Sequence, residues 1–166
     1  MERGLARCGL LLSIFILGLI LCGRNAPAAV LDHQALAGMI VPPYALGEPV
    51  NDKGVWTLLN SGGAEAGYVF ETGPLAPLPG FSGAPINMLV TIDRDGRFLD
   101  VRLLSHNEPI FVSGLGEAPL RAFLEQYRGH SIREPLVVGT PYGEAGNGSD
   151  LVYLDGVTKA TASVRI

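Results

Sequence analysis

The sequence predicts an α+β domain built on a twisted, mainly antiparallel sheet with a few packed helices. Along residues 87–106, apolar residues alternate on both sides of an Asp-Arg-Asp-Gly turn, which is the pattern of an antiparallel hairpin. Residues 114–128 instead repeat apolar side chains at helical spacing, so one face of a helix is expected to pack on the sheet. The apolar positions of this helix are Leu120, Phe123, Leu124 and Tyr127.

The remaining elements are expected in order along the chain. Residues 32–40 form a short helix that Asp32 caps, and short strands are expected at residues 55–59, 67–71, 136–138 and 151–154. The hairpin should form the middle of the sheet, with Gly96 at positive φ. Residues 140–150 are rich in glycine and polar residues, which predicts an exposed loop.

Prolines and glycines dominate residues 72–85, so neither a helix nor a central strand is expected to run through them. One interpretation is a rigid surface loop. The other is a ledge of backbone, in which glycines such as Gly83 let the main chain lie close to a flat ligand.

The first 29 residues have the composition of an export signal. Arg3 and Arg7 precede an apolar stretch at residues 10–21, and small residues follow at 26–29. We therefore expect a signal peptide or N-terminal anchor at 1–29, a helix and lead-in strands at 30–66, and the main domain at 67–166. That domain is expected to be truncated at its C-terminus.

Charge and cysteine usage exclude several functions. The full chain carries −4, and the leader holds three Arg and one Glu, which leaves −6 on the remainder. An acidic domain without a basic stripe is not expected to bind nucleic acid. Both cysteines, Cys8 and Cys22, lie in the leader, so the exported part has no disulfide or thiolate chemistry.

The segment at residues 155–161 places hydroxyl and carboxylate side chains among small residues, directly after an apolar run. Its residues Asp155, Gly156, Thr158, Ala160 and Thr161 resemble the flavinylation motif of FMN-binding domains, Asp-x-x-(Ser/Thr)-x-Ala-(Thr/Ser). The resemblance implies covalent FMN, joined through its phosphate to the Thr161 hydroxyl. The family often has Gly where this chain has Lys159. A threonine is a poor nucleophile without a neighbouring base, so a separate transferase is expected to make the bond. The resemblance implies that this protein is an FAD-dependent FMN transferase, with Asp155 as a recognition residue.

Two further segments carry the same resemblance. Residues 80–86 are similar to the Gly-aromatic-x-Gly-x-x-Ile segment of these domains, and His106-x-Glu108 followed by Gly-Leu-Gly at 114–116 is similar to another. The insertion between Glu108 and these glycines is typical of the NosR-type branch, which is related to the Rnf and sodium-pumping quinone reductase subunits. His106 and Glu108 are expected either to contact the flavin ring or to order the loop over it.

The resemblance implies an electron-transfer component at the periplasmic face of the inner membrane, rather than a stand-alone enzyme. Its implied partners are a quinol-side or iron–sulfur redox protein and, directly or indirectly, nitrous oxide reductase. One alternative is a non-redox sensory or assembly domain that regulates the expression or maturation of that reductase. The other is an ordinary secreted binding domain whose motif matches are coincidental.

Overall fold

The computed structural model of the chain describes residues 31–139 and 151–164, without the side chains of residues 161 and 162. The predicted leader at 1–29 and the predicted loop at 140–150 therefore lie outside the described residues. No helix in the described part is long and apolar enough to cross a membrane.

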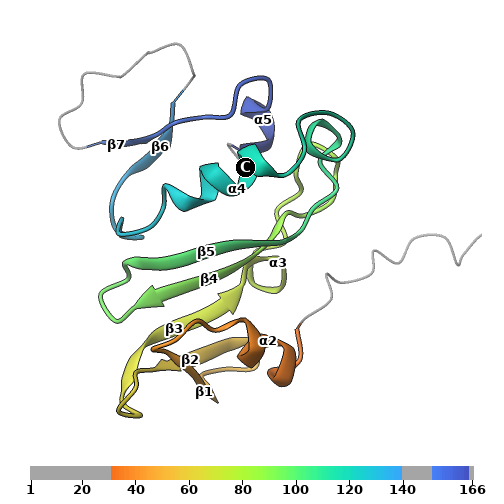
Figure 1. Cartoon of the computed structure of the whole chain (residues 1–166). Coiled ribbons are helices and arrows are strands. Elements are labelled where there is room, and N and C mark those ends of the chain that lie inside the picture. Colours follow the sequence, from red (N-terminus) through yellow and green to blue (C-terminus); the bar gives the residue numbers. More distant parts are fainter. Residues whose placement is uncertain (1–30, 140–150, 165–166) are drawn as a thin grey trace, which may run out of the picture.

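The fold is α+β, as predicted, and its larger sheet is wholly antiparallel (Figure 1). Each strand pairs with its neighbours in sequence, so the strand order is β1-β2-β3-β4-β5. The strands are β1 (Ala45–Pro49), β2 (Val55–Leu59), β3 (Glu65–Glu71), β4 (Asn87–Asp93) and β5 (Phe98–Ser105). Two short strands, β6 (Leu136–Val138) and β7 (Val152–Leu154), form a separate parallel pair.

The predicted hairpin is β4 and β5, and Gly96 in its turn has φ +80°. Its predicted place in the middle of the sheet is wrong, because β3 is central and β5 is an edge strand. After β5 the chain leaves the sheet instead of adding another strand. The start of the β5 edge is covered by backbone bonds, from the Phe98 amide to the His130 carbonyl and from the Gly129 amide to the Phe98 carbonyl, both 2.8 Å.

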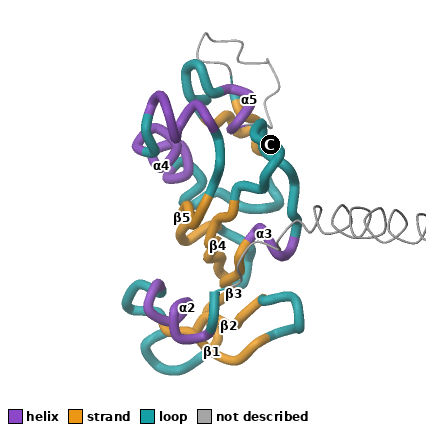
Figure 2. The backbone as a smooth tube through the Cα atoms, turned by 90° about the vertical axis from the view of Figure 1, so that its right-hand side faces the viewer, coloured by secondary structure: helices purple, strands orange, loops and turns teal. Residues whose placement is uncertain are grey.

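Helices cover both faces of the sheet. Among the described helices, α2 (His33–Met39) lies beside β1–β3, while α4 (Ala118–Glu125) and α5 (Thr161–Val164) lie on the β4–β5 side (Figures 1 and 2). Alternate residues of β4 and β5 serve two cores: Leu103 packs with the α4 side and Leu89 with the α2 side. Because β4 is covered on both faces, consecutive residues Leu89 and Val90 are both buried.

The helix starts follow local sequence signals. Asp32 caps α2 by accepting a 2.8 Å hydrogen bond from the Ala35 amide, as predicted. The predicted amphipathic helix is α4, with Pro119 in its first turn. No helix runs through residues 72–85, as predicted, although a single helical turn, α3 (Thr72–Leu75), lies at their start. Pro74 is tolerated there because the first-turn amides need no intrahelical partner.

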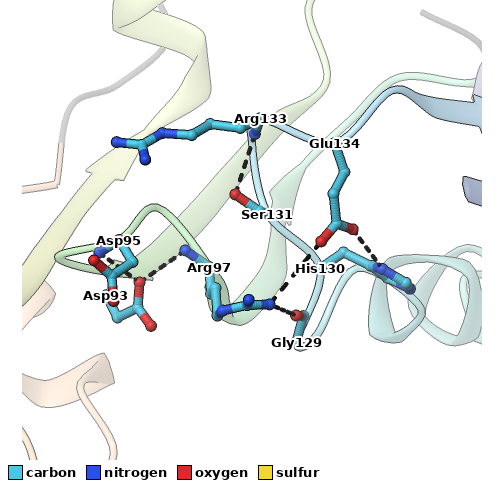
Figure 3. Close-up of polar contacts among 8 residues, drawn as sticks. All are labelled: Asp93, Asp95, Arg97, Gly129, His130, Ser131, Arg133 and Glu134. Atoms are coloured by element: carbon cyan, nitrogen blue, oxygen red, sulfur yellow. Dashed lines mark hydrogen bonds and ion pairs between the residues drawn. The ribbon is translucent and has the colours of Figure 1, made fainter. Parts of the chain in front are cut away.

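Side chains join the β4–β5 turn to the segment after α4 (Figure 3). The Arg97 guanidinium donates to the Gly129 carbonyl at 3.1 Å and lies 4.0 Å from Glu134, while His130 Nδ1 lies 2.9 Å from Glu134. On the other side, Asp93 Oδ1 accepts from the Asp95 and Arg97 amides. The turn and residues 129–134 therefore form one polar unit at the edge of the sheet.

Candidate functional site

The three segments singled out in the sequence meet at one cleft of about 430 Å³. Its walls come from the loop at residues 80–83, the segment at 109–114, and residues 159–163, where the motif ends and α5 (Thr161–Val164) begins. Its lining residues are Phe81, Pro109, Ile110, Ser113, Gly114, Lys159, Ala160 and Ser163. Apolar walls with a few polar groups, at this volume, are typical of a site for an organic cofactor.

A wholly buried carboxylate, that of Glu108, joins the walls of this cleft. Glu108 Oε1 accepts a 3.1 Å hydrogen bond from the Ser82 amide, and Oε2 accepts one from the Ser163 hydroxyl. The Glu108 carbonyl also accepts from the Phe111 and Val112 amides, at the start of the π-helical turn η1 (Phe111–Leu115). One residue thus links the 80–83 loop, η1 and α5.

His106 supports Glu108 from behind. Its side chain is 3% exposed, and its Nδ1 accepts a 3.1 Å hydrogen bond from the Glu108 amide. Its Nε2 lies 3.5 Å from Glu117, and its ring meets the Phe111 ring edge-on with centroids 5.9 Å apart. Neither His106 nor Glu108 lines the cleft. The geometry favours the second of their two predicted roles, ordering the loop, over contact with the ring.

Glu117 lies at the surface beside His106. Arg121 donates to its carboxylate at 2.6 Å, and this hydrogen bond, with a smaller contribution from His106, lowers the pKa of Glu117 below its ordinary value. His106 is therefore linked to the start of α4 through Glu117.

The loop at residues 80–83 is a tight turn. The Gly83 amide donates to the Gly80 carbonyl at 3.0 Å, and Gly83 has φ +81°. A Cβ on Gly80 would lie 2.3 Å from Glu108 Oε1, so only glycine lets the loop approach the buried carboxylate. The turn leaves Phe81 at the cleft, 71% exposed. Gly83 itself is not among the lining residues.

The first half of the motif is fixed by its backbone and not by its polar side chains. The Asp155 amide donates to Gln126 Oε1 at 2.7 Å, and Gln126 Nε2 donates back to the Asp155 carbonyl at 3.0 Å. A Cβ on Gly156 would lie 2.5 Å from the Gly139 carbonyl oxygen, so the chain passes β6 too closely for another residue. Asp155 and Thr158 are exposed, where another protein can reach them.

The second half of the motif is a tight turn held by the core. The Ala160 amide donates to the Val157 carbonyl at 3.0 Å, and both of these residues are buried. Lys159 occupies the third position of this turn with φ +67°. A positive φ there is the signature of a type II turn and favours glycine, which explains the family's frequent glycine at this position.

Thr161 begins α5, and its side chain lies outside the described residues. Its neighbours Ala160 and Ser163 both line the cleft. Its role as the attachment point stays a prediction, supported by this placement. A second, more open hollow of about 440 Å³ lies between α4 and the start of the motif, lined in part by Asp155, Gly156 and Thr158.

Sequence reasoning missed Ser163, Phe81 as a cleft wall, and Ser113. Ser163 is a small polar residue with no local signal, because its partner Glu108 lies 55 residues earlier in the chain. Phe81 could have been predicted from the sequence, because it is the aromatic residue of the Gly-aromatic-x-Gly-x-x-Ile segment at residues 80–86.

The structure is a small α+β domain with a cleft between two loops and the turn at residues 157–160. The chain belongs to the FMN-binding domain family, whose model matches residues 80–166. This match includes all three segments that form the cleft.

The similar proteins are longer than this chain. The chain is 31% identical over 165 residues to the regulatory protein NosR of Pseudomonas aeruginosa, and the match covers 99% of the chain and 22% of that protein. It is also 31% identical over 153 residues to NosR of Stutzerimonas stutzeri, covering 92% and 20%. Protein NirI of Paracoccus denitrificans is 28% identical over 104 residues, covering 63% and 14%. The chain thus spans about a fifth of the length of the NosR proteins and is a NosR-type FMN-binding domain.

Proposed function

We propose that this chain carries FMN as a phosphoester on Thr161 and transfers electrons at the periplasmic face of the inner membrane, in support of nitrous oxide respiration. The observation that carries the proposal is the cleft itself. Three segments far apart in sequence form it, and residues on both sides of Thr161 line it.

The residues present fit this cofactor. Phe81, Pro109 and Ile110 offer apolar surface for a flat ring system, while Ser113 and Lys159 offer polar groups for its edge or phosphate. When bound, FMN supplies one- or two-electron chemistry. The chain's own task is to hold the ring between the loops, to exclude water from one side of it and to fix the attachment segment.

Attachment needs a second protein. No described histidine or carboxylate side chain lines the cleft next to Ala160 or Ser163, so no base there is placed to activate a threonine. We infer that an FAD-dependent FMN transferase joins the Thr161 oxygen to the FMN phosphorus. The pyrophosphate bond of FAD breaks, AMP leaves, and the hydroxyl proton passes to a base of the transferase. The exposed Asp155 and Thr158 are suited to recognition by that protein.

Intact-mass measurement tests the attachment. The chain is exported together with the transferase, and the wild type is expected to gain the mass of one FMN minus one water. Thr161→Ala is expected to lose this increment. Ser61→Ala is the control, since it removes an exposed hydroxyl from the turn between β2 and β3, outside the cleft and the motif. An unmodified wild type, or a modified Thr161→Ala protein, contradicts the proposal.

A second candidate function follows from the relatives' names, because both NosR proteins are described as regulatory. In this case the domain senses or assembles without transferring electrons. Complementation of a deletion strain with the full-length protein separates the two. Thr161→Ala is expected to abolish nitrous oxide reductase activity if the flavin carries electrons, and to preserve it if the domain acts by partner contact alone.

A further inference from the structure

Lys159 has an unfavourable backbone conformation for its residue type. Among the described residues it is the one non-glycine with positive φ, at +67°. Left-handed conformations are rare for residues with a long side chain, and they concentrate at functional sites. The buried Val157 and Ala160 fix both ends of the turn, so Lys159 cannot relax to a negative φ without displacing core residues.

Lys159 is one of the residues that line the cleft. It lines the wall with Ser113 and Gly114 from the η1 segment. Within residues 31–139 and 151–164 it makes no ion pair and no side-chain hydrogen bond. The other cationic groups of the described residues do not line this cleft. Lys159 is therefore the one cationic residue of the described chain that lines this mostly apolar cleft, and no ion pair holds its ammonium group.

We propose that Lys159 is a cofactor-binding residue whose ammonium group favours the reduced form of the FMN held in this cleft. Uptake of two electrons from the donor and one proton from solvent leaves the ring with one more negative charge than before. A cation at the cleft wall stabilises that added charge by Coulomb attraction. The inference rests on the function proposed above. It attributes part of the reduction potential of the bound FMN to Lys159, which stands where the family often has glycine.

Potentiometric titration of the flavinylated protein tests this role. Lys159→Asn removes the charge, and asparagine tolerates a left-handed φ. We expect the equilibrium to shift about tenfold toward the oxidised cofactor, which lowers the potential by about 30 mV for a two-electron couple. Lys159→Arg keeps the charge and is expected to keep most of the potential. The shift should shrink at high salt, because Lys159 is exposed.

Lys53 provides the matched control. It is the other lysine of the described residues and is exposed on the turn between β1 and β2, strands at the far side of the sheet order from β5. Lys53→Asn is expected to leave the potential unchanged. Lys159→Gly, which suits the turn best, is a second neutral variant. It should lower the potential as Lys159→Asn does, while the melting temperature of the flavin-free protein stays equal or rises.

The outcomes separate the two claims. A wild type without flavin overturns the proposed function and this inference together. Flavinylated Lys159→Asn and Lys159→Gly proteins with the wild-type potential overturn the role of Lys159 alone. A lowered potential accompanied by a lowered melting temperature in both neutral variants also overturns it, because a structural disturbance then accounts for the shift.

Discussion

Glu108 has an unusual position for a carboxylate, because it is wholly buried and bonded to neutral donors on two different segments. Charged groups are rarely buried unless their hydrogen bonds are satisfied. Here the Ser82 amide and the Ser163 hydroxyl satisfy it, and Glu108 in turn gives the buried Ser163 hydroxyl a partner. The residue therefore holds the cleft together without lining it.

Glu108→Ala is expected to destabilise the domain by about 2–4 kcal/mol, since it leaves the buried Ser163 hydroxyl unpaired and opens a cavity. Glu108→Gln keeps the shape and one acceptor, so a smaller loss is expected. Urea denaturation measures both. Glu48→Ala is the control, because this exposed carboxylate on β1 forms no side-chain hydrogen bond among the described residues. Equal stability of Glu108→Ala and wild type would show that the buried linkage is unimportant.

At the scale of elements, the polar unit of Figure 3 fastens the β4–β5 turn to the segment that follows α4. The hydrogen bond from His130 is the largest cause that lowers the pKa of Glu134 below its ordinary value, and Arg97 contributes. A carboxyl whose pKa is lower in the folded than in the unfolded state stabilises the fold above its unfolded pKa. This contribution is lost as the pH falls through the folded value.

We therefore expect the melting temperature to decline as the pH falls into and below the ordinary titration range of glutamate, with Glu134 contributing to the decline. In Glu134→Gln the melting temperature should fall less steeply over this pH range. Near neutral pH, the melting temperature of the variant should stay close to the variant's own maximum. Thermal unfolding over a pH series measures this. Because Glu134 is at the surface, the effect is expected to weaken with added salt. An unchanged slope in Glu134→Gln would assign the decline to other carboxylates.

A buried network at the other end of the sheet joins the start of the described chain to the sheet. Glu71 accepts from the Leu31 amide at 2.5 Å and from Asn87 Nδ2 at 2.8 Å, and Asn87 Oδ1 accepts from the Gly73 amide at 2.9 Å. This network fixes where β3 ends and α3 begins. Its members are far apart in sequence, so no local pattern indicated it.

At the scale of the whole molecule, local signals predicted the elements well. The Asp32 cap, the alternation along β4 and β5 and the apolar face of α4 all appear as expected. What they did not predict is the arrangement of strands, because pairing partners are set by contacts between distant residues. The hairpin was placed centrally for its apolar alternation, whereas β5 is an edge strand protected by residues 129–130.

The site was also predicted only in part. The resemblance pointed to the three segments that form the cleft, but it did not predict which of their residues line the cleft and which lie behind its wall. Glu108 was predicted either to contact the ring or to order the loop over it, and it lies buried behind the wall. Lys159 was a departure from the family pattern and proves to line the cleft at positive φ. Both outcomes depend on tertiary packing, which short motifs do not contain.

The central claim is that the flavin ring lies between the 80–83 loop, the 109–114 segment and the end of the motif. Amide hydrogen exchange tests it directly, by comparing the flavinylated protein with the unflavinylated Thr161→Ala protein. Slower exchange on flavinylation is expected at residues 80–83, 109–114 and 159–163. Slower exchange confined to the hollow beside α4, or to that beneath α2 lined by Met39 and Tyr44, would contradict the account.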